Sequence, residues 1–441
     1  MDYGAALDHL ETLINHEARP RAGRVAGLSL ESAQRLTAGM GNPQRCYRVI
    51  HVTGTNGKGS TVRITSRLLQ EMGLRVGAYT SPHLVAPTER ISVDSEPIDP
   101  EVFGAAIGDV ARFTDHLQMR ATWFETVTVA ALQHFADVAV DVAVVEVGML
   151  GRFDATNVVD AQVATITNVG LDHTDGAGNW RLAVAGEKAG IIKPSSTVVC
   201  GETDPETRDV FRAEPHSAMF ERGRDFGAER ESLAVGGWLA DLRTPYGLHA
   251  DVLVSLHGRH QLDNASLAVT TAEAFFEAQL SDEVIGAALA NVKVPGRFEI
   301  AGREPLIVLD GAHNPDGARA AAVTLSEDFA PSGRHFLVVG MQSGRDVVGV
   351  LQGLEAGGAE RVICCSAPTT RGIPAAEVAA AATSIGAAAE AAGDVETALD
   401  RALELAGAGD AVTVTGSFTV VGAAKVALSE RSRAAGQTSR L

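Results

Sequence analysis

One strand–loop–helix pattern near the start of the chain limits its fold more than any other feature. Residues 49–61 read Val-Ile-His-Val-Thr-Gly-Thr-Asn-Gly-Lys-Gly-Ser-Thr, a β-branched run followed by a glycine-rich loop with one lysine. An apolar periodicity then predicts a helix from Ser60 to Met72, which Gly73 ends. Glycines let a backbone close around an anion, and the N–H groups at a helix start point toward it. The pattern therefore predicts a phosphate-binding loop between a strand and a helix.

The loop departs from the common P-loop pattern at two places. Val52 stands where the first glycine of that pattern belongs, and Gly59 separates Lys58 from the hydroxyls that follow. The placement between a strand and a helix still favours nucleotide binding over a chance turn. The expected nucleotide-binding residues of this loop are Gly54, Thr55, Asn56, Gly57, Lys58, Gly59, Ser60 and Thr61.

Length and charge restrict the class of protein further. A chain of 441 residues exceeds one typical core, so two or three domains are expected. The formal net charge of -18 argues against a nucleic-acid partner and against an anionic membrane surface. The four cysteines show no paired metal spacing, and the sequence shows no apolar signal core and no run of membrane-span length. We therefore expect a soluble cytoplasmic protein.

Strand and helix patterns alternate along most of the chain, which indicates parallel sheets covered by helices. Residues 294–296, Val-Pro-Gly, have the composition of a connector, and a second alternation begins beyond them. We expect an α/β protein with a P-loop parallel-sheet domain over residues 1–293 and a smaller Rossmann-like α/β domain over residues 294–441. In the second domain the alanine-rich residues 375–392 are predicted to form a surface helix, because alanine favours helices.

Polar side chains follow two strands of the first predicted domain. Glu146 ends the apolar run 141–147, and His173 follows the next run, 163–169, beside Asp172. Ligands of parallel sheets bind at the carboxyl ends of the strands, so Glu146 is a candidate partner of Mg²⁺. The alternative for Glu146 is a solvated strand end. His173 by itself would more often be structural, but its place beside Asp172 makes it a candidate neighbour of a metal or phosphate.

Lysine is rare in this chain. It occurs only as Lys58, Lys188, Lys193, Lys293 and Lys425, while arginine supplies nearly all the other positive charge. Lys188 lies on a short amphipathic segment before apolar residues, where burial would lower the pKa of its amine. Such an amine can react with CO2 to give a carbamate, which is a metal-ligating anion. The residues alone do not decide between this interpretation and a surface lysine.

Two further polar groups follow apolar runs in the second half of the chain. Arg297 lies in the run Pro-Gly-Arg-Phe-Glu at 295–299, and Asp310 precedes the turn-forming run Gly-Ala-His-Asn-Pro. A guanidinium can hold a phosphate through two hydrogen bonds, and a carboxylate can accept from a ribose or an ammonium. Each residue alone could instead be a helix cap or a surface ion pair. Together, near a domain junction, they suggest a second wall of one cleft.

These motifs make the chain resemble the folylpolyglutamate synthase/dihydrofolate synthase family of Mur-ligase-like, ATP-dependent amide ligases. The matching stretches follow the family order and span nearly the whole chain. They are residues 53–61, 79–84, 89–91, 122–125, 145–157, 171–174, 187–191, 260–265, 295–299, 310–315 and 415–417. The resemblance implies a Mur-ligase-like ATP-binding domain over residues 1–293 and a glutamate-ligase domain over residues 294–441.

The resemblance also implies roles for single residues. Lys58 and its loop would hold the phosphates of ATP, and Asn264 would contact the adenine. Arg297 would contact a phosphate, and Asp310 would lie near the ribose. The implied catalytic residues are Lys58, Lys188 and His313.

A magnesium site and a substrate site are implied in the same way. The magnesium set resembles that of the family and comprises Ser81, Glu146, His173 and Lys188, the last as a carbamate that holds metal. The substrate residues lie where the family docks its pterin and its incoming glutamate, and they are Ser81, Phe124, His313 and Ser417.

The implied reaction joins L-glutamate to the carboxylate of a folate or of dihydropteroate, through an acyl phosphate and with release of ADP and phosphate. Attack of one anion on another requires charge neutralisation and in-line positioning rather than a protein nucleophile. ATP and Mg²⁺ are therefore the expected cofactors, and a monomer is expected. Another Mur-type amino-acid-adding ligase and a non-catalytic nucleotide-binding module are the alternatives. Whether dihydropteroate, reduced folates or both are substrates stays open.

Overall fold

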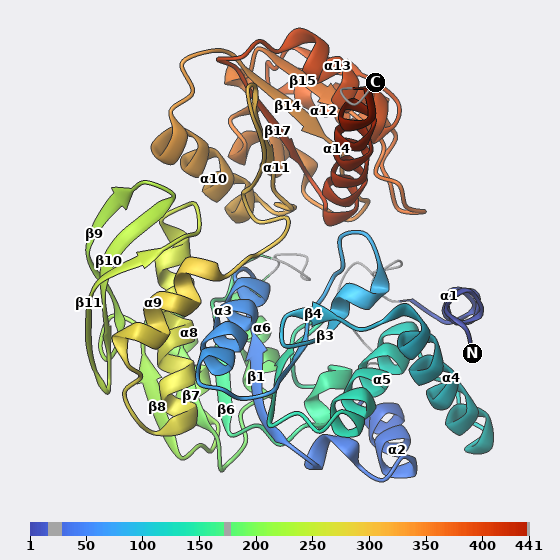
Figure 1. The fold of residues 1–441 in the computed structure, drawn as a ribbon, viewed down its shortest axis with the longest axis vertical. Helices are drawn as coiled ribbons and strands as arrows, with labels where there is room; N and C mark the ends of the chain where they lie inside the picture. Colours follow the sequence, from blue (N-terminus) through green and yellow to red (C-terminus); the bar gives the residue numbers. More distant parts are fainter. Residues whose placement is uncertain (16–28, 172–177, 439–441) are drawn as a thin grey trace. The chain divides into compact units, whose positions relative to one another are not determined.

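The computed structural model describes residues 1–15, 29–171 and 178–438, and the chain divides into two compact units (Figure 1). Unit 1 comprises Met1–His83, Pro87–Ser255 and His260–Lys293. Unit 2 comprises Leu84–Ala86, Leu256–Arg259 and Val294–Leu441. Two short segments of unit 2 are therefore flanked on both sides by the chain of unit 1.

Unit 1 contains the phosphate loop. Its described helices are α1 (Tyr3–Thr12), α2 (Glu31–Gly39), α3 (Lys58–Glu71), α4 (Pro100–His116), α5 (Trp123–Asp137), α6 (Trp180–Ala189), α7 (Pro205–Ala213), α8 (His260–Phe276) and α9 (Asp282–Asn291). Its described strands are β1 (Arg48–Thr53), β2 (Val76–Tyr79), β3 (Ile91–Val93), β4 (Glu96–Pro97), β5 (Val142–Glu146), β6 (Val163–Ile166), β7 (Thr197–Cys200), β8 (Ala218–Glu221), β9 (Gly227–Ala234), β10 (Gly237–Thr244) and β11 (Gly247–Val254).

The main sheet of unit 1 has the strand order β4-β3-β2-β5-β1-β6-β7-β8. The neighbouring strands β2, β5, β1, β6, β7 and β8 run parallel, while β3 and β4 pair antiparallel at one edge. One apolar core joins the sheet to α4 and α5, and another joins it to α3 and α8, so helices cover both faces (Figure 1). The predicted parallel α/β architecture of the first domain is confirmed. Because β5 and β6 flank β1, their carboxyl ends lie on either side of the phosphate loop.

Helix starts in unit 1 carry caps that are visible in the sequence. Asp99, Thr122 and Asp204 each accept a hydrogen bond from a backbone N–H of the first turn that follows. Thr122 and Glu125 form a reciprocal capping box at the start of α5. Such caps satisfy N–H groups that the helix leaves without an internal partner, and they fix where the chain turns into the helix.

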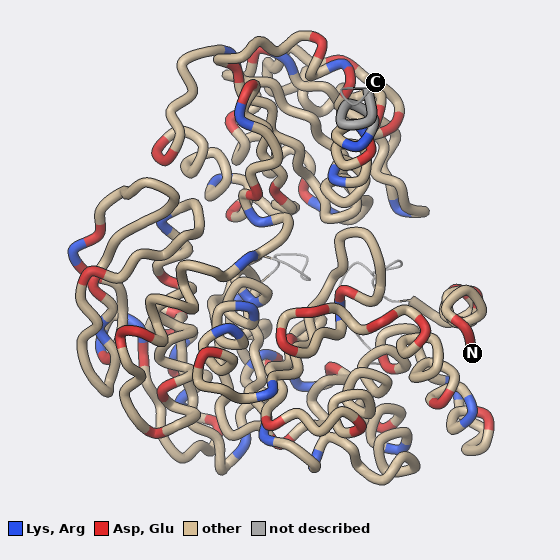
Figure 2. Tube along the Cα trace, in the orientation of Figure 1, with Lys and Arg blue, Asp and Glu red and all other residues tan. Residues whose placement is uncertain are grey.

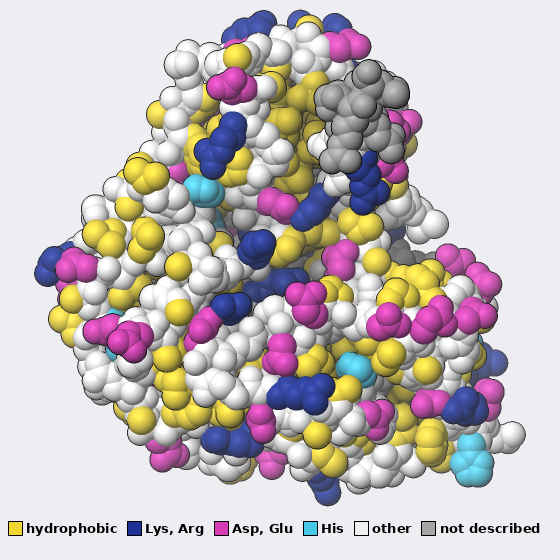
Figure 3. Space-filling model, viewed as in Figure 1, with side chains coloured by type: hydrophobic (Ala, Val, Ile, Leu, Met, Phe, Trp, Pro, Cys, Tyr) yellow, Lys and Arg dark blue, Asp and Glu magenta, His cyan; other side chains and the backbone are white. Residues whose placement is uncertain are grey.

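A small antiparallel sheet, β11-β10-β9, packs against α8 and α9. Buried His249 of β11 joins these elements, since its ring contacts Glu273 of α8 at 2.9 Å and Asp282 of α9 at 2.7 Å. Burial disfavours the charged imidazole, but the two carboxylates outweigh burial and raise the pKa of His249. The turn between β9 and β10 exposes Val235 fully. On the face in Figure 3, apolar side chains are interspersed with polar and charged ones.

Unit 2 contains a second sheet with the strand order β12-β13-β17-β14-β15-β16. Its described strands are β12 (Glu299–Arg303), β13 (Leu306–Leu309), β14 (His335–Val339), β15 (Arg361–Cys364), β16 (Ala389–Ala391) and β17 (Ala411–Thr415). Its described helices are α10 (Pro315–Thr324), a π-helical turn (Leu325–Phe329), α11 (Val347–Gly353), α12 (Ala375–Ser384), α13 (Val395–Leu405) and α14 (Phe418–Thr438). Only β12 runs antiparallel within the described sheet, so the predicted Rossmann-like α/β architecture is confirmed.

The prediction of one helix over residues 375–392 is wrong in its second half. The helix α12 ends at Ser384, and Gly386 follows with a φ of +86°. The chain then forms β16, which adds an edge strand to the sheet of unit 2 by pairing with β15. Alanine propensity favours a helix throughout this stretch, but glycine at a positive φ ends the helix and the sheet edge captures the alanines beyond it.

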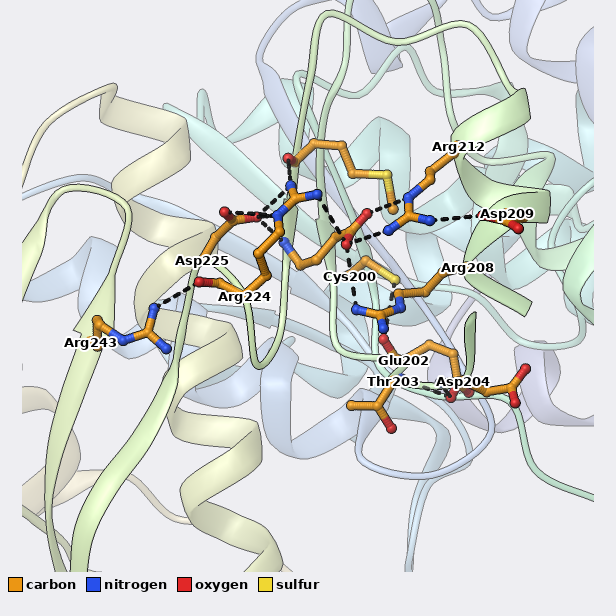
Figure 4. A network of polar contacts seen from close by, with 12 residues as sticks. Cys200, Glu202, Thr203, Asp204, Arg208, Asp209, Arg212, Arg224, Asp225 and Arg243 are labelled. Atoms are coloured by element: carbon orange, nitrogen blue, oxygen red, sulfur yellow. Dashed lines mark hydrogen bonds and ion pairs between the residues drawn. The ribbon is translucent and has the colours of Figure 1, made fainter. Parts of the chain in front are cut away.

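A buried carboxylate organises the corner between α7 and β8 (Figure 4). Glu221 ends β8 and is 1% exposed. Arg212 donates to both of its oxygens, at 2.6 and 2.7 Å, and Arg208 and Arg224 lie within 3.4 and 3.2 Å of one of them. The hydrogen bonds from Arg212 lower the pKa of Glu221 against the opposing effect of burial. A buried carboxylate requires such compensation, so these arginines have a structural task.

Charges of both signs are dispersed along the described chain, as Figure 2 shows. The visible trace shows no single basic stripe of the kind that follows a nucleic-acid backbone. Among the described residues, no helix combines the length and the apolar character that crossing a bilayer requires.

His51 generates a prediction about acid stability. It lies in β1, its Nε2 contacts Thr156 Oγ1 at 2.9 Å, and its Nδ1 is buried without a hydrogen-bond partner among the described residues. Burial, with a smaller contribution from the charge of Lys193, lowers the pKa of His51 from 6.5 to about 3. Unfolded protein therefore binds a proton between these pH values that folded protein does not, and the folded state loses stability as pH falls below 6.5.

We expect His51→Gln to reduce this loss, because an amide does not titrate and still donates to Thr156. The free energy of unfolding, measured by urea titration, should fall more steeply from pH 7 to pH 5 in the wild type than in the variant. The difference in slope should be about 1 kcal/mol per pH unit. Exposed His116 at the end of α4 supplies the control His116→Gln. Parallel profiles for wild type and His51→Gln would contradict the assignment.

Candidate active site

The loop between β1 and α3 is held in shape by the residues that follow β6. The N–H of Thr55 donates to the carbonyl of Asn168 at 3.0 Å, and the N–H of Asn56 donates to Asn168 Oδ1 at 3.0 Å. The carbonyl of Asn56 accepts from Thr167 Oγ1 at 2.6 Å and from Asn168 Nδ2 at 3.1 Å. These bonds fix the loop backbone through the protein's own groups, as an anion site built from N–H groups requires.

Two glycines of the loop are required by their surroundings. Gly54 has a φ of +150°, and a Cβ there would lie 1.7 Å from Thr167 Oγ1. Gly57 precedes α3 with a φ of +84°, and a Cβ there would lie 2.4 Å from Asn264 Oδ1. Neither separation is sterically possible, and L-residues rarely adopt these φ values. The two glycines therefore let β6 and α8 approach the loop closely.

Lys58 is the first residue of α3, and its side chain turns back over the loop. Its Nζ donates to the carbonyls of Gly54 at 3.1 Å and Thr55 at 3.2 Å. The next hydroxyl residues, Ser60 and Thr61, lie in the first turn of α3 and are buried. The ammonium of Lys58, the hydroxyls of Ser60 and Thr61 and the positive end of a 14-residue helix thus lie at one loop.

Glu146 lies beside this loop, as predicted from its place at the end of β5. Its carboxylate is buried, and Oε2 accepts the N–H of Ser81 at 3.2 Å. The same oxygen is 3.5 Å from the Cβ position of Gly59. Burial lowers the pKa of Arg63 in α3, and the charge of Glu146 opposes this shift. The structure therefore brings Glu146, Ser81 and the phosphate loop together.

The other two residues of the predicted magnesium set differ in what the structure says about them. His173 lies outside the described residues. Lys188 lies in the last turn of α6 and is only 3% exposed, so it is a buried lysine rather than a surface lysine. Arg152 contacts the same turn: its N–H donates to the carbonyl of Glu187, and its guanidinium donates to the carbonyl of Gly186.

Asn264 and Phe124 come from two helices of unit 1, α8 and α5. Asn264 lies in the first half of α8, where its Nδ2 donates to Gln261 Oε1 at 2.9 Å and its Oδ1 faces Gly57. The structure therefore places Asn264 beside the phosphate loop. Phe124 lies in the first turn of α5, with its ring against Gly148 and 6.0 Å from the ring of Tyr79. Gly148 follows β5, so the ring of Phe124 lies at the same carboxyl edge that carries Glu146.

A buried arginine holds the segment around Ser81. Arg90 is 2% exposed, its Nε donates to Nδ1 of His83 at 2.9 Å, and its Cζ lies 4.5 Å from the centre of the Trp123 ring. The N–H of Thr80 donates to the carbonyl of Arg90 at 2.9 Å. The two ends of the segment from Thr80 to Arg90, both of which belong to unit 1, are thereby fixed to each other.

In unit 2, Asp310 follows β13 and uses both carboxylate oxygens on the backbone. Oδ2 accepts the N–H of Phe298 at 2.8 Å, and Oδ1 accepts the N–H of Ala312 at 2.8 Å. The N–H of Gly311 also donates to the carbonyl of Gly296 at 2.8 Å. Asp310 therefore links the segment around Arg297 to the turn that precedes α10.

His313 and Ser417 lie at the carboxyl ends of neighbouring strands β13 and β17. His313 Nδ1 is 2.8 Å from the carbonyl oxygen of Gly311, and because a carbonyl only accepts, Nδ1 carries the hydrogen. Ser417 Oγ accepts the N–H of Val420 at 3.2 Å and lies 3.0 Å from Thr419 Oγ1. The structure thus brings Arg297, Asp310, His313 and Ser417 to one edge of the unit 2 sheet.

The structure adds residues that the sequence did not single out. Thr167 and Asn168 shape the phosphate loop, and Phe418 contacts both Arg297 and His313. The polar run after β6 contained a usable signal, since carboxyl ends of neighbouring strands meet. Phe418 directly follows the Thr-Gly-Ser stretch at 415–417, but a single aromatic carries no pattern of its own.

Two domain families match this chain. The Mur ligase middle domain matches residues 52–272, and the Mur ligase glutamate ligase domain matches residues 296–418. The dihydrofolate synthase/folylpolyglutamate synthase of Mycobacterium tuberculosis is 40% identical over 342 residues, which span 72% of this chain and 70% of that protein.

Solved structures agree in fold over almost the full length. The folylpolyglutamate synthase of Mycobacterium tuberculosis complexed with ADP matches with a TM-score of 0.88 at 35% identity, covering 97% of this chain and 99% of that chain. A bifunctional folylpolyglutamate synthase/dihydrofolate synthase with Mn, AMPPNP and L-glutamate bound matches with a TM-score of 0.85 at 31% identity, covering 97% and 98%.

The close approach at Gly57 generates a prediction about nucleotide affinity. Gly57→Ala should displace Asn264 and distort the loop, and so weaken ATP binding about tenfold or more, which is ~1.4 kcal/mol or more. Gly73→Ala is the matched control, because Gly73 has a φ of +81° with nothing within 4 Å of its Cβ position. Both variants carry the same backbone strain, and only the first meets a neighbouring side chain. Equal ATP affinities by isothermal titration would show that the loop tolerates a Cβ at Gly57.

Proposed function

The chain belongs to the folylpolyglutamate synthase/dihydrofolate synthase family of Mur ligases, and we propose that it uses ATP to join L-glutamate to the carboxylate of a folate or of dihydropteroate. The observation that carries the proposal is the phosphate loop of unit 1, with buried Glu146 beside it. The products are an amide, ADP and phosphate. The substrate carboxylate takes the γ-phosphoryl group of ATP to give an acyl phosphate, and the amine of glutamate then displaces phosphate.

The residues of unit 1 act on the first step by lowering electrostatic repulsion. Both the attacking carboxylate and the γ-phosphate are anions, so their approach requires positive charge and fixed geometry. We assign the phosphates to the N–H groups of residues 54–61 and to Lys58, whose Nζ already lies at the loop carbonyls. Asn264, beside Gly57, is assigned to the adenine. Because the loop is already held by Asn168, little reorganisation accompanies binding.

Magnesium suits the donor atoms beside this loop. Mg²⁺ prefers oxygen ligands, keeps several waters, and is commonly bound by one or two carboxylates together with substrate phosphates. The buried carboxylate of Glu146 and the hydroxyls of Ser81 and Ser60 provide such a set. We assign the metal to Glu146 and Ser81, with His173 and a carbamate on Lys188 as further members. When bound, the ion neutralises charge on the phosphate oxygens.

The residues of unit 2 are assigned to phosphate and to the incoming amino acid. Arg297 offers the planar donors that hold a phosphate oxygen pair, and Asp310 fixes the backbone next to it while lying near the ribose. His313 and Ser417 are assigned to glutamate. Because Nδ1 of His313 donates to Gly311, a neutral imidazole carries its lone pair on Nε2 and accepts a hydrogen bond from the ammonium. Phe124 and Ser81 are assigned to the pterin side.

The proposed division of labour gives residues 1–293 the ATP-binding role and residues 294–441 the glutamate-ligase role. We propose that the protein acts as a monomer and that it acts in the cytoplasm, where ATP is available. A cell-wall amino-acid-adding ligase remains the competing assignment. It would use a nucleotide-linked peptide precursor in place of the pterin substrate.

The function is tested by measuring ADP release from ATP with dihydropteroate or a reduced folate, with and without L-glutamate. We expect release that depends on glutamate and on one or both acceptors, and Lys58→Ala should lower its rate on the order of 10²-fold or more. A folded Lys58→Ala protein with near wild-type rate would refute the phosphate assignment. Release that requires a cell-wall precursor instead of a pterin would move the chain to the competing class.

The assignment of a carbamate to Lys188 generates a separate prediction. CO2 adds to the neutral amine with loss of a proton, so a cation becomes an anion, whereas a guanidinium stays protonated and does not react comparably. Lys188→Arg should therefore be inactive, and Lys188→Ala should be weak but partly restored by added short carboxylates. An adduct under bicarbonate would be visible in high-resolution density. Full activity of Lys188→Arg would exclude the carbamate.

A further inference from the structure

One aromatic ring in unit 2 contacts two of the residues assigned above. Phe418 is the first residue of α14 and is half-buried. The guanidinium carbon of Arg297 lies 4.5 Å from the centre of its ring. The imidazole of His313 lies with its centroid 6.2 Å away and tilted by 55°. These distances match a cation–π contact and an aromatic pair.

The same ring determines the turn that carries His313. A Cβ at Gly311 would lie 3.0 Å from the nearest atom of the Phe418 ring, so the ring fills the space that any larger residue would need. The carbonyl of Gly311 accepts the hydrogen of His313 Nδ1, which sets the plane of the imidazole. The position of Phe418 is therefore coupled to the backbone that orients His313.

The backbone of Arg297 is fixed independently of the ring. Gly296 has a φ of +69° and Phe298 a φ of +43°, and both lie in the left-handed region. Phe298 is held there by its N–H bond to Asp310 and by stacking on Phe329, with ring centroids 5.4 Å apart at 27°. A non-glycine residue keeps such a conformation only where its surroundings enforce it.

A fixed backbone does not fix a long side chain. An arginine loses much of its rotamer freedom when its guanidinium is held in one place. The ring of Phe418 restricts the guanidinium of Arg297 before a phosphate arrives, because the negative face of the ring attracts the cation. The entropy cost of ordering the Arg297 side chain is then part of folding and does not reduce the affinity for the ligand.

We propose that Phe418 is a positioning residue that holds the guanidinium of Arg297 and the imidazole of His313 in their working orientations. The proposal rests on the proposed function, in which Arg297 contacts a phosphate and His313 the incoming amino acid. Phe418 acts through these two side chains. Gly311 is required as a consequence, since the ring occupies its side-chain space.

A double-mutant cycle on nucleotide binding tests the link to Arg297. The probe is a non-hydrolysable ATP analogue with Mg²⁺, titrated into wild type, Phe418→Leu, Arg297→Ala and the double variant. Phe418→Leu should weaken binding about five- to tenfold in the wild type, as loss of a cation–π contact would. In the Arg297→Ala background it should weaken binding less than about twofold. Phe418→Tyr keeps the ring face and should bind like the wild type.

The unit offers a matched control for general damage to the fold. Arg334 lies over the ring of Phe336 at 5.0 Å, and neither residue is assigned to a ligand. Phe336→Leu removes a similar ring from under an arginine and should lower thermal stability without weakening analogue binding at temperatures where the variant is folded. The histidine is read by NMR: the ring signals of His313 should shift in Phe418→Leu and stay unchanged in Phe336→Leu.

Several results would overturn the proposal. Additive effects of Phe418→Leu and Arg297→Ala would show that the ring does not act through the guanidinium. Weak binding in Phe418→Tyr, or His313 signals unchanged in Phe418→Leu, would do the same. Failure of the proposed function is distinguishable, because it would appear as analogue binding without glutamate-dependent ADP release, and the cycle would still report on Phe418.

Discussion

Hydrogen bonds from the end of β6 to the backbone after β1 are the interaction on which the candidate site depends. Asn168 bonds both the N–H and the carbonyl of Asn56, and Thr167 bonds the same carbonyl. The backbone of the loop is therefore held on both sides of the Asn56 Cα. Space for these bonds exists only because Gly54 lacks a side chain. Glycine is required at position 54 because Thr167, after the neighbouring strand, leaves no room for a side chain. The loop can therefore keep its phosphate-binding shape although Val52 replaces the first glycine of the common P-loop pattern.

The second unit solves a similar problem with a different group. Asp310 accepts two backbone N–H groups and so joins the chain before β12 to the turn after β13. The carboxylate of Asp310 fixes the backbone at this edge, as the side-chain amide of Asn168 fixes the backbone of the phosphate loop. In both places a short polar side chain at a strand end holds a neighbouring segment. The side chains that we assign to phosphates, Lys58 and Arg297, are longer and project from these fixed backbones.

The sequence predicted the parallel sheets because buried parallel strands are continuous apolar runs, as at β5 and β6, and it placed Glu146 because strand ends meet at one edge. The sequence analysis was wrong at residues 385–392. Alanine propensity favours a helix there, but it carries no information about the strand β15, with which the residues after Gly386 pair. The burial of Lys188 and the contacts of Phe418 depend on residues far apart in the chain, and local patterns do not encode such distances. The arginines around Glu221 are invisible to sequence for the same reason.

The division of the chain into units bears on how such a protein can be rebuilt. Leu84–Ala86 and Leu256–Arg259 belong to the second unit, although both are embedded in the sequence of the first. A single cut at Lys293 would leave these segments on the N-terminal fragment, so the C-terminal fragment would lack part of its own unit. Domains that are joined by a single linker can be exchanged between proteins by one recombination event at that linker. Here a transplanted C-terminal module would arrive without two of its own segments, and compatible partners must match at three places in the gene.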